Sequence, residues 1–205
     1  NKKQETYVHS AATNGKAHAI KLLLEKGALV NPKDISGVTP IVRALRHKKK
    51  EAAETLILSG ADLRAVDKDG RTLLHMMAFW LNEKSMLDRF LKVIDINTVD
   101  GKGRSALHEI AYWGHIVNAK EMIEAGASVN LQAKNGETPL FEAIKSKNYA
   151  MTELLLKKGT KPNLVNTSGD TAVKTAIKSE NPDLKIITLL LELGSDPNLK
   201  NTYGE

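Results

Sequence analysis

Short runs of apolar residues recur along the chain at helical spacing, and polar turns separate them. Within a run the apolar positions are adjacent or three to four residues apart, and the three- and four-residue spacing marks the buried face of an amphipathic helix. The runs are Ile20, Leu23 and Leu24; Leu56 and Ile57; Leu87, Phe90 and Leu91; Met122 and Ile123; Leu154 and Leu155; and Leu189, Leu190 and Leu191. This pattern predicts one amphipathic helix in each of six consecutive segments, with a shorter helix before it.

Glycine gives the segments a fixed period. One series recurs every 33 residues, at Gly37, Gly70, Gly103, Gly136 and Gly169. A second series follows the predicted amphipathic helices, at Gly27, Gly60, Gly126, Gly159 and Gly194, and Val93 stands where one glycine is missing. Such a period is typical of stacked repeats, each of which contacts only its neighbours. We therefore expect a single array over 1–205, cut from a longer protein, with units 1–33, 34–66, 67–99, 100–132, 133–165 and 166–200, and with 201–205 opening a further unit.

Two columns of residues predict where the helices begin and end. A hydroxyl residue that can cap the first helical N–H groups recurs at Thr6, Thr39, Thr72, Ser105, Thr138 and Thr171. Pro40 and Pro139 follow two of these residues, at the first helical position, where the missing N–H has no cost. The second glycine series falls where helices end in left-handed geometry. Because a β-branched residue resists that geometry, Val93 predicts a reshaped helix end.

These residues resemble the ankyrin repeat family. Its Thr-Pro-Leu-His motif is matched by Thr39-Pro40-Ile41, Thr72-Leu73-Leu74-His75, Ser105-Ala106-Leu107-His108 and Thr138-Pro139-Leu140. Its Gly-Ala turn with a following Asn is matched by Gly27-Ala28, Gly60-Ala61 and Gly126-Ala127 and by Asn31, Asn130, Asn163 and Asn198. The resemblance implies an all-α solenoid of stacked helix-turn-helix units joined by hairpin-like loops. It also implies a scaffold that holds another macromolecule on a concave surface lined by the shorter helices, rather than an enzyme.

Composition and motifs remove several other functions. The chain has no cysteine, which excludes disulfides, thiolate zinc sites and a cysteine nucleophile. His9, His75 and His108 share one repeat position, but nothing nearby completes a metal shell, so we expect helix-start histidines, no metal and no cofactor. No Ser-His-Asp set or carboxylate pair falls outside the repeat pattern, which predicts no enzymatic activity. No apolar run is long enough to cross a bilayer, and we expect a cytoplasmic protein.

Aromatic residues mark the candidate binding site. The resemblance implies that the last two positions of each shorter helix face partners. Those positions hold Thr13-Asn14, Arg46-His47, Phe79-Trp80, Tyr112-Trp113, Lys145-Ser146 and Lys178-Ser179. Both tryptophans of the chain fall there, so Phe79, Trp80, Tyr112 and Trp113 are predicted to anchor a partner. The alternative is that these rings fold into the core around the irregular unit 67–99.

Charge suggests the chemistry of that partner. The formal net charge is +6, and the excess lies in units 1–33, 34–66 and 133–165. The predicted basic contacts are Arg46, His47, Lys145 and Lys178 at the helix ends and Lys68, Arg71, Lys102 and Arg104 in the hairpins. They predict another protein with an acidic or mixed apolar-acidic surface. Two alternatives stay open: a nucleotide or single-stranded nucleic acid stacked on the same rings, and a structural spacer within a larger receptor, channel, toxin or effector.

Overall fold

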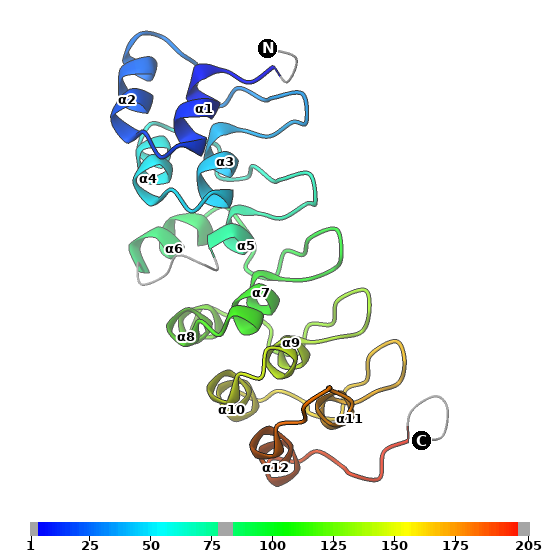
Figure 1. Ribbon diagram of the computed structural model, residues 1–205. Helices are drawn as coiled ribbons and strands as arrows, with labels where there is room; N and C mark the ends of the chain where they lie inside the picture. Colours follow the sequence, from blue (N-terminus) through cyan, green and yellow to red (C-terminus); the bar gives the residue numbers. More distant parts are fainter. Residues whose placement is uncertain (1–3, 78–83, 201–205) are drawn as a thin grey trace. The chain divides into compact units, whose positions relative to one another are not determined.

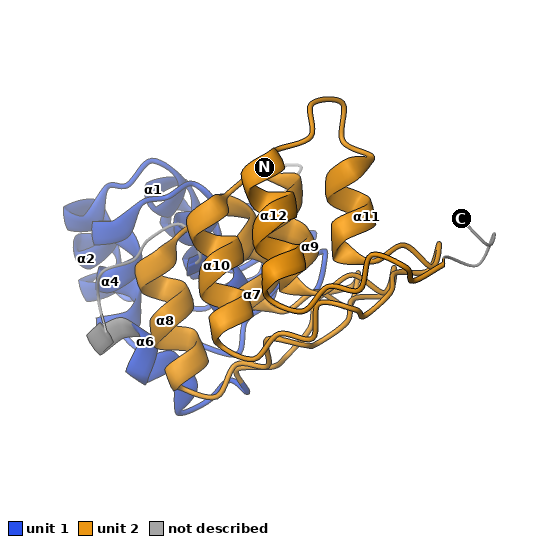
Figure 2. Ribbon diagram, turned by 90° about the horizontal axis from the view of Figure 1, so that it is seen from below, with its two compact units in different colours: residues 1–95 blue, residues 96–205 orange. Residues whose placement is uncertain are grey.

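The computed structural model describes residues 4–77 and 84–200, which form two compact units, residues 1–95 and 96–205 (Figure 2). The regular secondary structure of the described residues is α-helical. Backbone pairing between their extended segments is limited to isolated bridges, such as the one between Val66 and Thr72. None of the helices in these ranges is long and apolar enough to cross a membrane. The predicted all-α fold is therefore confirmed.

Each unit is built from pairs of short helices joined by hairpin-like loops (Figure 1). Unit 1 contains α1 (Tyr7–Thr13), α2 (Ala17–Glu25), α3 (Pro40–Arg46), α4 (Lys50–Leu58), α5 (Leu73–Met77) and α6 (Lys84–Leu91). Unit 2 contains α7 (Ala106–Trp113), α8 (Ile116–Glu124), α9 (Pro139–Lys145), α10 (Tyr149–Lys157), α11 (Ala172–Ile177) and α12 (Leu184–Glu192). The odd-numbered helices follow the hairpins directly, and we call them the inner helices.

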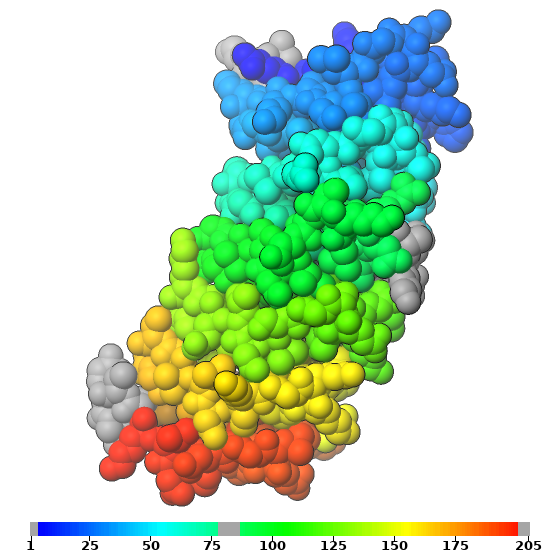
Figure 3. All heavy atoms as spheres, turned by 180° about the vertical axis from the view of Figure 1, so that it is seen from behind, coloured from blue at the N-terminus to red at the C-terminus, as the bar shows by residue number. Residues whose placement is uncertain are grey.

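In unit 2 the inner helices α7, α9 and α11 pack in sequence order, and the outer helices α8, α10 and α12 pack behind them. Successive repeats of this unit follow one another in layers (Figure 3). Large apolar side chains are completely buried between the layers; they include Leu107, Ile110, Leu140, Phe141, Met151 and Leu155. Each repeat therefore buries its apolar face mainly against its neighbours, as the repeat period predicts.

The hydroxyl column caps some inner helices but not all. In α7, the Ser105 N–H donates to Nδ1 of His108 at 3.0 Å, and the Ser105 hydroxyl lies 3.0 Å from the same nitrogen. In α11, Thr171 accepts directly from the Lys174 N–H at 3.4 Å. The buried hydroxyls of Thr39 and Thr138 have no hydrogen-bond partner. These two residues precede proline and have apolar residues, not histidine, three positions later, so the capping prediction fails there.

The helix ends behave as the glycine column predicts. At the end of α8, Gly126 has φ +98° and the Ala127 N–H reaches back to the carbonyl of Met122 at 2.9 Å. Val93 has no left-handed φ, and the Ile94 N–H bonds instead to the nearer carbonyl of Phe90 at 2.8 Å. The predicted reshaping at Val93 is confirmed.

Asparagines connect four of the repeats to the next one, whereas the repeat 34–66 has Arg64 at this position. Asn130 donates from Nδ2 to the carbonyl of Gly159 at 3.1 Å and accepts from the Lys161 N–H at 2.7 Å. The same pair of hydrogen bonds joins Asn31 to Gly60 and Asp62, Asn97 to Gly126 and Ser128, and Asn163 to Gly194 and Asp196. These bonds fix the register of consecutive repeats along the turn that follows each outer helix.

The turn between inner and outer helices holds a strained residue in the fifth repeat. Lys147 has φ +53°, whereas Gly114 holds the same position one repeat earlier at φ +74°. We expect Lys147→Gly to raise the free energy of unfolding by about 0.5–1 kcal/mol, because the left-handed penalty exceeds the entropy that glycine adds to the unfolded chain. Urea denaturation followed by circular dichroism measures the change. Lys147→Ala keeps the Cβ and should give no gain; equal stability of the two variants would contradict the explanation.

Candidate functional site

Two aromatic side chains lie at the end of the inner helix α7. Ile110 and Ala111 of this helix are buried, whereas Tyr112 is 42% exposed and Trp113 is 50% exposed. The two rings meet edge to face, with centroids 5.3 Å apart and planes at 87°. The core alternative therefore does not hold for these two residues. Phe79 and Trp80, the other predicted anchors, lie outside the described residues.

The lysines that end the next inner helices are paired with carboxylates. Lys145 of α9 donates to Glu137, and Lys178, which directly follows α11, donates to both carboxylate oxygens of Asp170, at 2.7 and 2.9 Å. Each acid ends a hairpin and precedes its lysine by eight residues. The carboxylate side chains are only 8% and 10% exposed, whereas the ammonium side chains are 39% and 51% exposed. The lysines thus form the accessible part of each pair.

Arg104 is held between two further acids. Its guanidinium lies 3.3 Å from Glu109 in its own repeat and 3.6 Å from Glu142 in the next. Burial raises the pKa of Glu142 above its usual value, and the positive charges of Arg104 and Lys145 offset this only in part. The Arg104 side chain is also more enclosed than those of Lys145 and Lys178. Arg104 therefore mainly ties two repeats together.

We call these residues the inner surface of unit 2: Tyr112, Trp113, Lys145, Lys178, Arg104, Glu109, Glu137, Glu142 and Asp170. Its four acids outnumber its three basic residues, and the sequence analysis did not identify any of the four. The signal that could have found two of them is the eight-residue spacing of Glu137 from Lys145 and of Asp170 from Lys178. The surface is therefore mixed in charge, with its cations outermost.

Some of the predicted basic residues of unit 1 are exposed, and one holds a buried carboxylate. Arg46, His47 and Lys68 are exposed. Arg71 instead holds the buried carboxylate of Asp67 through Nε at 2.8 Å. Burial acts to raise the pKa of Asp67, but hydrogen bonds from the Arg71 backbone and guanidinium outweigh it, and the pKa lies below its usual value. In unit 2, Lys102 is exposed at a hairpin tip.

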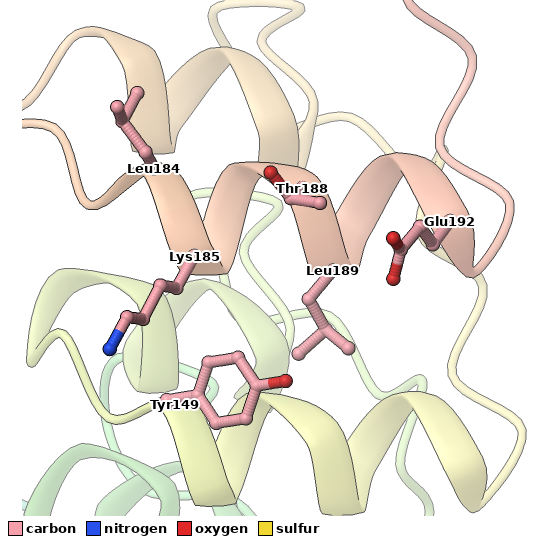
Figure 4. A pocket seen from close by; sticks show the side chains of 6 residues that line it. All are labelled: Tyr149, Leu184, Lys185, Thr188, Leu189 and Glu192. Carbon is pink, nitrogen blue, oxygen red and sulfur yellow. The ribbon is translucent and has the colours of Figure 1, made fainter.

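Two hollows open on different sides of unit 2. An open hollow of about 360 Å³, which we call the polar cavity because most of its lining residues are polar, lies on the inner side and is lined by Glu137, Ile144, Lys145, Asn166, Asp170, Thr175, Lys178 and Ser179. An open groove of about 670 Å³ lies between the outer helices α10 and α12. Figure 4 shows the ring of Tyr149 below Leu189, with Lys185 and Glu192 at opposite ends of the groove. The polar cavity adjoins the predicted site residues Lys145 and Lys178, whereas the outer groove contains none.

The histidine column has a structural role. His9 and His108 accept backbone N–H bonds at Nδ1, from Thr6 at 3.2 Å and Ser105 at 3.0 Å. Their Nε2 atoms then carry the proton, which reaches the carbonyls of Val38 at 2.9 Å and Glu137 at 3.1 Å in the following repeats. Over residues 4–77 and 84–200, no group of three or more His, Asp or Glu side chains is arranged to hold a metal ion.

The arrangement defines a helix-turn-helix repeat protein, and comparison with known proteins identifies its family. A family model that describes three copies of the ankyrin repeat matches this chain over four overlapping ranges: residues 1–67, 49–133, 74–166 and 119–201. The chain belongs to the ankyrin repeat family. Because the repeats of this family bind other proteins and the fold generally serves as a non-enzymatic scaffold, an interaction module is the coarse function.

Individual relatives match this chain over only about a third of its length. Inversin from Gallus gallus is 36% identical over 72 residues, 35% of this chain and 6% of that protein. The probable E3 ubiquitin-protein ligase XBOS33 from Oryza sativa is 39% identical over 72 residues, 35% of this chain and 14% of that protein. Protein phosphatase 1 regulatory subunit 12A from Mus musculus is 39% identical over 67 residues, 33% of this chain and 6% of that protein. The matched segment is thus a small part of each relative.

Solved structures support the fold over nearly the whole chain. The ankyrin repeat domain of human ASB11 gives a TM-score of 0.80 at 21% identity and covers 98% of this chain and 89% of that one. The ankyrin repeat domain of Bcl-3, a member of the IkappaB family, gives 0.78 at 24% identity and covers 99% of this chain and 92% of that one. At these identities the likeness concerns fold alone.

Proposed function

We propose that unit 2 binds a partner protein on its inner surface, with Tyr112 and Trp113 as the apolar anchor. The observation that carries the proposal is the exposed pair of rings at the end of α7. Tyrosine and tryptophan bury large areas at little cost in side-chain entropy, and they are enriched among the residues that dominate binding energy. Their contact with each other also reduces the motion that binding would have to remove.

The charges favour a protein over a nucleic acid as the partner. Lys145 and Lys178 present ammonium groups at the ends of the two following inner helices, where they would favour acidic side chains in a partner that also covers the rings. Four carboxylates lie among these cations, however, so this surface lacks the excess of positive charge that binding to a phosphate backbone requires. A mixed apolar-acidic protein surface therefore fits better. The cytoplasmic location remains a prediction, consistent with the lack of cysteine.

Trp113→Ala tests the anchor. Proteins that copurify with the chain are identified by quantitative mass spectrometry, and the affinity of the recovered partner is then measured with purified components. We expect Trp113→Ala to weaken binding by about 30-fold or more, the effect of losing a dominant interface residue. Val117→Ala is the matched control, because Val117 is an apolar residue of outer helix α8 with 52% exposure. Equal losses for both variants would refute the assignment.

Fluorescence gives a second measurement of the same contact. The chain has two tryptophans, so Trp80→Phe leaves Trp113 as the only one. If the partner covers Trp113, its emission shifts to shorter wavelength and acrylamide quenches it less. Unchanged emission in the saturated complex would place the partner elsewhere. Loss of the partner on nuclease treatment would instead support the nucleic-acid alternative.

A further inference from the structure

We infer that unit 1 carries a second interaction surface, which binds a short acidic segment of a protein. The surface lies at the turns that join inner to outer helices in the first two repeats, and we call it the basic turn surface. It is separate from the inner surface of unit 2 and goes beyond the function proposed for that surface. Its members are Lys16, Arg46, Lys48, Lys49 and Lys50.

The fold brings the two turns together. Lys16 directly precedes α2 and Lys49 directly precedes α4, and these two outer helices pack against each other (Figure 1). A Cβ built on Gly15 would lie 3.0 Å from Cδ of Lys49, so the Lys49 side chain lies against the backbone of the first turn, next to Lys16. Cations from two repeats therefore share one surface.

Acidic side chains do not balance this surface. The two turns and the start of α4 contain five basic residues but only two acids, Glu51 and Glu54. Glu54 lies 3.9 Å from Lys50. Over the residues that the structure describes, three of the five cations pair with no carboxylate: Lys16, Arg46 and Lys49. The surface therefore has an excess of positive charge that attracts an anionic partner.

Stability does not account for these cations. The N-terminal end of a helix carries partial positive charge, so cations placed there are unfavourable. Lys16 nevertheless stands at the start of α2, and Lys49 and Lys50 stand at the start of α4. Lys48 has φ +54°, at the position where the first repeat has Gly15 at φ +71°. Local rules of this kind are broken mainly at functional sites, and a bound anion would relieve the electrostatic part of the cost.

The chemistry of the surface favours a protein as its partner. The turns 14–16 and 47–49 contain no Phe, Tyr or Trp on which nucleic-acid bases could stack. They also contain no large apolar side chain that could enter a lipid layer. The Arg46 guanidinium can bind one carboxylate through two parallel hydrogen bonds, and the ammonium groups can bind others from several directions. A segment with several acidic residues close together therefore fits best.

Fluorescence anisotropy of a fluorescein-labelled hexaglutamate peptide tests the inference. We expect saturable binding to the 205-residue chain in low-salt buffer, and weaker binding as the salt concentration rises. Lys16→Gln/Lys49→Gln should raise the Kd about three- to tenfold, the strength of two exposed ion pairs. Glutamine keeps the side chain as far as Cδ, the atom of Lys49 that lies against Gly15.

Thermal denaturation separates binding from folding in the same variant. The double variant should melt at or above the temperature of the unaltered chain, because it removes two cations from the N-terminal ends of helices. Weaker binding without lower stability would show that the two lysines serve the partner. A variant that melts well below the unaltered chain would overturn the inference, because the lysines would then serve the fold.

Lys26→Gln/Lys33→Gln is the matched control. It removes the same charge from two exposed positions of unit 1 that lie beyond the other end of α2, so the Kd should not change. Equal losses for the two double variants would overturn the inference, since net charge alone would then explain the binding.

Other anions test the class of partner. A thymidine oligonucleotide with six phosphates, or vesicles that contain phosphatidylserine, should bind more weakly than the peptide. Tighter binding of either one would overturn the assignment to a protein, and so would a lack of saturable peptide binding. Trp113→Ala should leave peptide binding unchanged, so a failure of the unit 2 anchor and a failure of the basic turn surface give different results.

Discussion

Replacing Gly114 with alanine is expected to lower the free energy of unfolding by about 2–4 kcal/mol, the sum of a left-handed backbone penalty and a lost helix cap. Gly114 has φ +74°, and a Cβ there would lie 2.0 Å from Nδ2 of Asn148. Asn148 cannot move freely, because its Oδ1 accepts the Met151 N–H at 2.9 Å and caps α10. Urea denaturation measures the loss.

Gly126→Ala separates the two causes of this effect. Gly126 has φ +98°, and an added Cβ would meet nothing within 4 Å. It should therefore show the backbone penalty alone, about 1–2 kcal/mol. If both variants lose the same stability, the contact with Asn148 has no role. Because Gly114 directly follows Trp113, its replacement should also weaken partner binding by changing where α7 ends.

Replacing His108 with alanine is expected to cost about 2–4 kcal/mol of unfolding free energy, because a buried donor loses its acceptor and a cavity forms. The imidazole is completely buried, and its Nδ1 accepts the N–H of Ser105, which is also buried. Its Nε2 donates to the carbonyl of Glu137, the residue whose carboxylate pairs with Lys145. The variant should therefore also loosen Glu137, which lines the polar cavity.

His18→Ala is the control for the histidine prediction. His18 lies exposed on the outer helix α2, and its replacement should change stability by less than about 0.5 kcal/mol, as for other surface sites. Thermal denaturation of both variants at one pH gives the comparison. A loss below about 1 kcal/mol for His108→Ala would show that water replaces the ring in the Ser105 hydrogen bond.

Local chemistry explains which features of the fold the sequence predicted. The glycine column and the histidine at the helix start each depend on residues within a few positions, and the structure confirms them. Val93 is one example, since the shape of one side chain predicted an altered helix end. The hydroxyl column was less reliable, because the bonds of Ser105 depend on His108, and Thr39 and Thr138 lack such a partner.

The site was only partly predictable, for a related reason. The register placed Tyr112 and Trp113 at the end of an inner helix, and their exposure agrees with a binding role that remains to be tested. Counting charges predicted that Lys145 and Arg104 contribute positive charge, but it did not predict which carboxylates they pair with. Glu137 pairs with Lys145 across the boundary of a hairpin and a helix, and Glu142 reaches Arg104 from the next repeat. Helical spacing rules cover neither relation.

The asparagine that reaches forward from most of the outer-helix turns makes the chain easy to lengthen in evolution. The repeats 100–132 and 133–165 each supply both halves of the bond: the glycine carbonyl that receives the previous asparagine, and the asparagine that reaches the next glycine. A duplicated segment of 33 codons would inherit the two halves together and join the array without new contacts. New repeats could then diverge on their inner surface, as the change from Tyr112 to Lys145 to Lys178 illustrates, while the bonds between neighbours stay the same.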